Sequence, residues 1–303
     1  MPGEDGSRGV WNIVPTPFTP DGALDEASLS TLTAFVAGCG VDGMTILGVL
    51  GEAGKLSDEE RRRVILRVIG SAGDLPVCVG VSHAATDRAV GFAQEAADLG
   101  ATSLMLAPPA LAKPNDAAVV AHYRAVAGAV SVPIVVQDHP ASSGVQMSVD
   151  LLTTIARDVP RCRVIKLEDE PTPPKVSRLL AVDPDLRILG GLGAIMLLEE
   201  LRRGAVGTMT GFGFPELLVE IVGTFVAGDE AGARAVFDRI MPIIRFENQA
   251  GLNLAIRKHI YRRRGAIASE RLRAPGPVMD PATIADLDAV LDALGLADRL
   301  TPA

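Results

Sequence analysis

One lysine in an apolar segment has the setting of a reactive amine. Lys166 follows Val164 and Ile165 and is followed by Leu167. A charged side chain turned toward an outer layer of helices would be unsupported, which favours an inward orientation. Burial strips water from the ammonium group, lowers its pKa from about 10.4 and makes a neutral amine available to attack a carbonyl. The alternative is a lysine at a strand end that reaches into solvent.

Two further side chains are candidates for proton transfer. Glu168 lies two residues after Lys166 and therefore on the same face of a strand. Partial burial would raise its pKa toward neutrality and let it act as acid and base, whereas its alternative role is a salt bridge to Lys166 or to a neighbouring arginine. His139 is the second candidate because imidazole titrates near about pH 6.5. Strand parity places His139 on the same side as Gln137.

Two glycine-rich segments could bring the backbone close to a ligand. Residues 48–52 form a glycine-bounded turn whose N–H groups suit a carboxylate. Residues 190–193 allow either close approach to a ligand or a tight turn. The predicted substrate-binding residues are Val49, Leu50, Gly51, Gln137, Ser142, Gly191 and Gly207.

The elements that must position these residues follow a repeated pattern. Short β-branched runs alternate with longer amphipathic stretches, which is typical of βα units on a parallel sheet covered on both faces. The predicted strands are 10–15, 43–49, 76–82, 103–107, 133–139, 163–168, 187–190 and 205–210. This α/β pattern favours a closed (β/α)8 TIM barrel over an open doubly wound sheet. In such a barrel the reactive groups lie at the carboxyl ends of the strands.

The last quarter of the chain reads as helical. We assign residues 1–229 to the barrel and residues 230–303 to a C-terminal helical extension packed on it. Because no low-complexity linker separates them, we expect a single structural domain.

Composition excludes several classes of partner. With 29 basic and 37 acidic residues the formal net charge is −8, and the basic residues are not gathered with aromatics, which argues against nucleic acid. No apolar run reaches about 18 residues, so we expect no membrane span. Three widely spaced cysteines in apolar surroundings indicate free thiols in a reducing compartment. We therefore expect a cytoplasmic protein.

The chain resembles the dihydrodipicolinate synthase and N-acetylneuraminate lyase family along nearly its whole length. Six segments match in the family's order: 15–18 before Asp21 and Gly22, 48–52 in place of G-T-T-G-E, Pro140 with Gly144 in Y-N-x-P-x-R-T-G, Ile165 with Lys166, 190–193, and 271–275. The resemblance implies that Lys166 forms an imine with pyruvate or another small 2-oxo acid and needs no metal or organic cofactor. It also implies a homo-oligomer, a dimer or a tetramer.

Departures from the family pattern bear on the substrate. Val49 and Leu50 replace the two threonines of the family's loop, Gln137 replaces its strand-five tyrosine, and Ser142 aligns with its carboxylate-binding arginine. An amide cannot titrate in the tyrosine's role. We therefore expect a Schiff-base lyase of aldolase or dehydratase type that is not a true dihydrodipicolinate synthase. The apolar residues around the mouth suggest an aromatic or alkyl aldehyde as a second substrate.

Two other functions are weighed against this one. A metal-dependent barrel lyase would use His83, Asp138, His139 and Glu168 as ligands, although their spacing is not that of a tight site. A non-catalytic descendant would bind 2-oxo acids in the lysine pocket without turnover.

Overall fold

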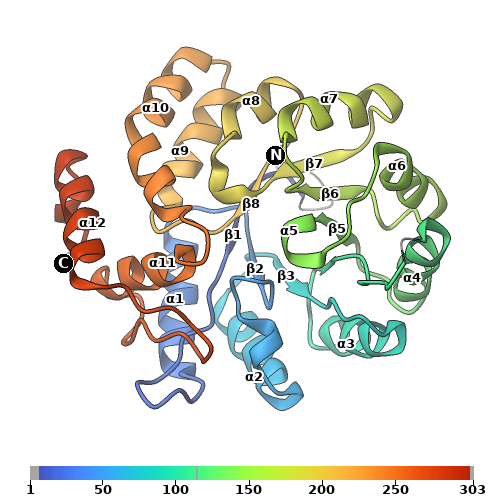
Figure 1. Ribbon diagram of the computed structural model, residues 1–303, viewed down its shortest axis with the longest axis horizontal. Helices are drawn as coiled ribbons and strands as arrows, with labels where there is room; N and C mark the ends of the chain where they lie inside the picture. Colours follow the sequence, from blue (N-terminus) through green and yellow to red (C-terminus); the bar gives the residue numbers. More distant parts are fainter. Residues whose placement is uncertain (1–6, 114, 301–303) are drawn as a thin grey trace.

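The computed structural model describes residues 7–113 and 115–300, and these residues form a closed parallel barrel. Residues 1–6 and 301–303, which the predicted ranges include, lie outside the described part. The strands are β1 (Gly9–Ile13), β2 (Gly43–Ile46), β3 (Val77–Gly80), β4 (Ser103–Leu106), β5 (Ile134–Asp138), β6 (Val164–Leu167), β7 (Arg187–Gly190) and β8 (Gly207–Thr210). β8 pairs with β1 and closes the ring (Figure 1). The predicted (β/α)8 fold is confirmed.

Alternating residues of the strands face the inside of the barrel and the surrounding helices. The inner cluster consists of Trp11, Ile13, Cys78, Met105, Val135, Val164, Leu189 and Met209, with Leu50 and Val206 packed against it. Residues of the opposite parity belong to the larger cluster under the helices. Residues two positions beyond the inner cluster therefore point inward at the carboxyl end of the barrel.

The helices surround the barrel on the outside, except for the short α5, which lies at the end of β5 (Figure 1). They are α1 (Glu26–Gly38), α2 (Asp58–Ser71), α3 (Thr86–Asp98), α4 (Asp116–Gly128), α5 (Pro140–Ser143), α6 (Val149–Asp158), α7 (Thr172–Val182), α8 (Leu197–Arg202) and α9 (Pro215–Val226). Short 3-10 turns occupy Ala53–Lys55, Leu192–Ala194 and Ala297–Leu300. α2 begins at a capping box formed by Ser57 and Glu60, a start that the sequence indicates.

Three helices follow the barrel and pack on one side of it. They are α10 (Glu230–Glu247), α11 (Asn253–Arg263) and α12 (Pro281–Ala293). α10 packs against α9, and α12 lies farthest from the barrel (Figure 1). On α11, the Tyr261 hydroxyl donates to the Phe212 carbonyl at 2.9 Å and accepts from the Asn12 amide of β1 at 3.2 Å. In the described part of the chain, we find no helix with the length and apolarity needed to cross a bilayer.

Candidate active site

Lys166 points into the carboxyl end of the barrel. It follows Val164, an inner-cluster residue, by two positions on β6, and its side chain is only 2% exposed. On the neighbouring strand Gln137 is its register partner. Its Nζ lies 3.1 Å from Oε2 of Glu168. The amine is thus enclosed, with a carboxylate as its nearest charged partner.

Glu168 lies at the meeting point of β5, β6 and β7. Its backbone N–H donates to the Asp138 carbonyl at 2.8 Å, which holds the residue beside the end of β5. Its Oε2 accepts from Gln137 Nε2 at 2.9 Å. Gly191 leaves space for this side chain, because a Cβ there would stand 2.3 Å from Glu168 Cγ. Lys166, Gln137 and Glu168 therefore form one hydrogen-bonded group.

The electrostatics of Glu168 correct one expectation. From the sequence we expect burial to raise the pKa of Glu168 toward neutrality, and burial alone does act in that direction. The positive charge of Lys166, the charge of His139 and the hydrogen bonds from Gln137 and Lys166 outweigh burial and hold the pKa below its usual value. Glu168 is therefore an ionised carboxylate in the free protein at neutral pH.

The turn after β2 forms a wall of the site. Val49 is 56% exposed, whereas Leu50 packs against the inner cluster. The Gly51 N–H donates to the Gly48 carbonyl at 3.0 Å and is already used within the turn. By contrast, the N–H groups of Val49 and Leu50 donate to no residue that the structure describes. These two donors, and not that of Gly51, are the ones that a ligand carboxylate can use.

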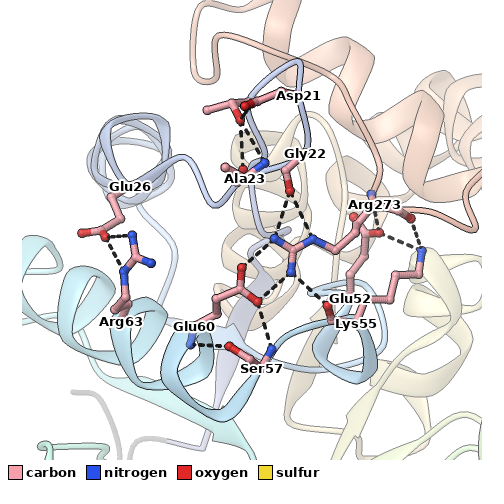
Figure 2. Close-up of polar contacts among 11 residues, drawn as sticks. Asp21, Gly22, Ala23, Glu26, Glu52, Lys55, Ser57, Glu60, Arg63 and Arg273 are labelled. Carbon is pink, nitrogen blue, oxygen red and sulfur yellow. Dashed lines mark hydrogen bonds and ion pairs between the residues drawn. The ribbon is translucent and has the colours of Figure 1, made fainter.

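A polar network joins this turn to the C-terminal extension. Glu52 receives hydrogen bonds from Lys258 Nζ at 2.7 Å and Lys55 Nζ at 2.8 Å. The guanidinium of Arg273 binds both carboxylate oxygens of Glu60 at 2.7 Å and also the carbonyls of Gly22 and Lys55 (Figure 2). The C-terminal extension, through Lys258 and Arg273, therefore stabilises the segment that follows Val49 and Leu50.

We expect Arg273→Ala to destabilise the fold by about 2–4 kcal/mol, because it removes the bidentate partner of Glu60 and leaves the carbonyls of Gly22 and Lys55 without this donor. The hydrogen bond to Arg273 lowers the pKa of Glu60 to about 2 from 4.5. The stability from this pair is therefore fully present above about pH 4.5 and is lost as the pH falls toward about 2. Urea unfolding of both proteins from pH 7 to pH 3 measures the difference. A difference in unfolding free energy that stays constant over this range would contradict the assignment.

His139 and Ser142 follow the end of β5, and the charge of His139 acts on Glu168. His139 Nδ1 and the Ser142 hydroxyl are 2.7 Å apart, so the ring is held by the first turn of α5. Ser142 and Gln137 line a cavity of about 620 Å³ together with the β2 turn. Glu168 lines a second cavity of about 760 Å³ on the side of α5 and α4. Gln137 and Glu168, which are hydrogen-bonded to each other, therefore each line one of the two cavities.

Three residues that the sequence analysis names as candidates lie outside the group formed by Lys166, Gln137 and Glu168. Gly207 begins β8 at the amino end of the barrel, where a Cβ would stand 1.9 Å from the Gly9 carbonyl oxygen. The structure therefore does not bring the predicted residue Gly207 to Lys166, and close packing against β1 is what requires a glycine here. Asp138 faces the helices and binds Lys175 Nζ at 2.6 Å, and burial raises its pKa to about 6. His83 accepts a hydrogen bond from the Ala85 N–H at 3.0 Å.

The ligand set of the metal-dependent alternative does not assemble. Among residues 7–113 and 115–300, no three His, Cys, Asp or Glu side chains are arranged to hold a metal ion. The buried charges of α11 were not predicted from the sequence, because they lie outside the strand ends of the barrel. The signal was Arg257-Lys258-His259 between Ile256 and Ile260, and all three residues are buried.

The chain is similar to known proteins over nearly its whole length. The model of the dihydrodipicolinate synthetase family matches residues 6–293. The L-2-keto-3-deoxyarabonate dehydratase of Azospirillum brasilense is 36% identical over 305 residues, 97% of this chain and 95% of that protein. The 4-hydroxy-tetrahydrodipicolinate synthase of Methanothrix thermoacetophila is 30% identical over 242 residues, 78% of this chain and 81% of that protein.

A solved structure is similar throughout. The crystal structure of dihydrodipicolinate synthase from Rhodopseudomonas palustris matches with a TM-score of 0.90 and 35% identity, covering 95% of this chain and 98% of that chain. The resemblance inferred from six short segments is confirmed. The chain belongs to the dihydrodipicolinate synthetase family and is one of its lyases, a group that forms Schiff bases with pyruvate and related 2-oxo acids.

Proposed function

We propose that the protein is a Schiff-base dehydratase that removes water from a 2-keto-3-deoxy sugar acid bound to Lys166. The observation that carries the proposal is the carboxylate of Glu168, 3.1 Å from the Lys166 amine and hydrogen-bonded to Gln137. A base in this place reaches the carbon next to the imine. The relative from Azospirillum brasilense, a dehydratase by name, supports this choice of reaction.

The reaction starts with attack of the Lys166 amine on C2 of the 2-oxo acid. Water leaves C2 and a protonated imine remains, while the N–H groups of Val49 and Leu50 hold the substrate carboxylate. Glu168 then removes a proton from C3, and the electron pair neutralises the imine nitrogen to give an enamine. The enamine expels the C4 hydroxyl, which takes a proton and leaves as water, and an unsaturated imine remains on Lys166. Hydrolysis of this imine at C2 returns one water, releases the product and frees the amine.

Electrostatics allow one carboxylate to perform both proton transfers. The cationic nitrogen holds the pKa of Glu168 low, so the residue begins as a base. When it takes the C3 proton, the nitrogen loses its charge and this attraction disappears. The pKa of Glu168 then rises, and the same residue can protonate the departing hydroxyl.

Synthesis of dihydrodipicolinate itself is a poorer fit to these residues. Gln137 stands where relatives have a tyrosine that transfers protons, and Ser142 where they have an arginine for the second substrate's carboxylate. Dehydration needs neither group and no aldehyde partner, since a single substrate suffices. An aldehyde would be required only for aldol chemistry at the same enamine.

We further propose that the protein acts in the cytoplasm as a homo-oligomer. Cys39, Cys78 and Cys162 are free thiols, which suits a reducing compartment. A dimer or tetramer is what the family likeness implies, and light scattering of the purified protein tests it.

The proposed function is tested by turnover and by trapping together. The protein is incubated with 2-keto-3-deoxypentonate, and loss of one water per substrate is followed by mass spectrometry. Borohydride with pyruvate is expected to leave a reduced adduct on the peptide that contains Lys166. Absence of both adduct and turnover in folded protein would overturn the proposal, and an adduct without turnover of any sugar acid would favour a binding protein.

A further inference from the structure

A buried lysine on the helix side of the sheet binds the ends of two neighbouring strands. Lys175 lies near the start of α7, and its side chain is 4% exposed. Its ammonium group has three N–H bonds, and each of them has an acceptor. Nζ donates to Asp138 Oδ2 at 2.6 Å, to Asp169 Oδ2 at 2.8 Å and to the Met147 carbonyl at 2.7 Å. The proposed reaction assigns no role to this cluster.

The two carboxylates of the cluster are chain neighbours of the group that contains the base. Asp138 directly follows Gln137 at the end of β5, and Asp169 directly follows Glu168 beyond β6. Because successive side chains point to opposite faces, Gln137 and Glu168 meet inside the barrel at 2.9 Å, while the two aspartates meet Lys175 outside it. The Glu168 N–H donates to the Asp138 carbonyl at 2.8 Å and joins the same two segments. The position of Glu168 is therefore fixed from both faces of the sheet.

We propose that Lys175 and Asp169 are positioning residues that hold the Glu168 carboxylate where it can remove the C3 proton, an inference that rests on the proposed function. Hydrogen bonds between charged groups are about twice as strong as those between neutral groups, and burial strengthens them further. Proton removal from carbon depends on such precision, because a displacement of about 1 Å can lower a rate about 10²-fold. Lys175 thus acts on the reaction through the position of Glu168.

The charges of the cluster decide which variant tests the inference. Burial raises the pKa of Asp138 to about 6, the bond to Lys175 lowers it, and the charge of Asp169 raises it. Asp138 is fully buried, so loss of Lys175 would leave a buried carboxylate without its cation and destabilise the whole protein. The side chain of Asp169 is 22% exposed, and Lys175 keeps Asp138 and Met147 as acceptors when it is removed. Asp169→Ala is therefore expected to fold.

The expected effect of Asp169→Ala is on proton removal and not on imine formation. We expect kcat with 2-keto-3-deoxypentonate to fall about 10- to 100-fold, while KM and the rate of borohydride trapping with pyruvate stay within about threefold of wild type. In Asp169→Asn the amide oxygen can still accept from Lys175, so this variant should recover most of the rate.

A matched control lies at the other end of the same strand. Asp183 accepts a hydrogen bond at 2.8 Å from Arg163, the residue before β6, and its side chain is 20% exposed. Asp183→Ala therefore removes an ion pair of the same length and similar burial at the amino end of the barrel. We expect kcat and KM of this variant to stay within about threefold of wild type.

A double variant separates an action through Glu168 from a general loss of structure. Glu168→Gln already lacks the base, so adding Asp169→Ala should slow dehydration less than about twofold further. Equal slowing in both backgrounds, an unchanged rate in Asp169→Ala alone, or a loss of trapping as large as the loss of kcat would overturn the inference and leave the proposed function standing. If wild type does not dehydrate the substrate, or Glu168→Gln reacts at the wild-type rate, the proposed function fails and this inference fails with it.

Discussion

Replacing Lys166 with alanine is expected to lower kcat by at least about 10⁴-fold and to abolish the borohydride adduct. The side chain is enclosed within the barrel and contacts the carboxylate of Glu168. Without the amine no imine forms, so C3 of the substrate loses the electron sink that makes its proton removable. Initial rates with 2-keto-3-deoxypentonate and peptide mass spectrometry after trapping measure both effects.

Two control variants make this result specific. Lys166→Arg keeps a positive charge opposite Glu168 but supplies no neutral amine, so its activity should fall as far as that of the alanine variant. Lys175 is also a buried lysine, but its Nζ is bound by Asp138 at 2.6 Å and Asp169 at 2.8 Å on the helix side of the sheet. We expect no adduct there. An adduct retained in Lys166→Ala would show that another amine forms the imine.

The fold was readable from the sequence because its signals are local and repeated. Each strand, such as Val164–Leu167, is an apolar run covered on both faces, and helix starts such as Ser57 carry side-chain caps. Eight successive strand-helix units are compatible with only a few chain topologies. Strand parity also placed Glu168 on the same face as Lys166, since a side-chain period of two depends only on neighbouring residues.

Contacts between distant elements were not readable in this way. The space above Gly211 is filled by Arg257, 46 positions later on α11, and no spacing rule connects a strand end with a helix outside the repeat. The direction of the pKa shift of Glu168 likewise depends on distances to Lys166 and His139 that exist only in the folded chain. The position of Gly207 at the amino end of the barrel was not predictable either, because a glycine required by strand packing looks the same in sequence as one that contacts a ligand.

Replacing Glu168 with glutamine is expected to lower kcat by about 10²- to 10⁴-fold while imine formation survives. The amide oxygen can still accept hydrogen bonds from Lys166 and Gln137, which now hold Oε2 at 3.1 Å and 2.9 Å, but it cannot take a proton. Borohydride should therefore trap the sugar acid on Lys166 in Glu168→Gln, with KM changed little. Glu168→Asp keeps a titratable group on a shorter side chain and should recover part of the rate.

The pH profile distinguishes a base at this position from a structural ion pair. Because the pKa of Glu168 is lowered from 4.5, the carboxylate stays ionised in the free enzyme throughout the neutral range, and kcat/KM should not fall on its account until below about pH 4.5. A fall in kcat/KM near pH 6 would instead match Asp138, whose pKa burial raises to about 6, and this fall should vanish in Asp138→Asn.

If Glu168→Gln dehydrates the substrate at the wild-type rate, the proton must be removed by another group. His139 is then the next candidate, since it lies at the same end of the barrel and its charge acts on Glu168.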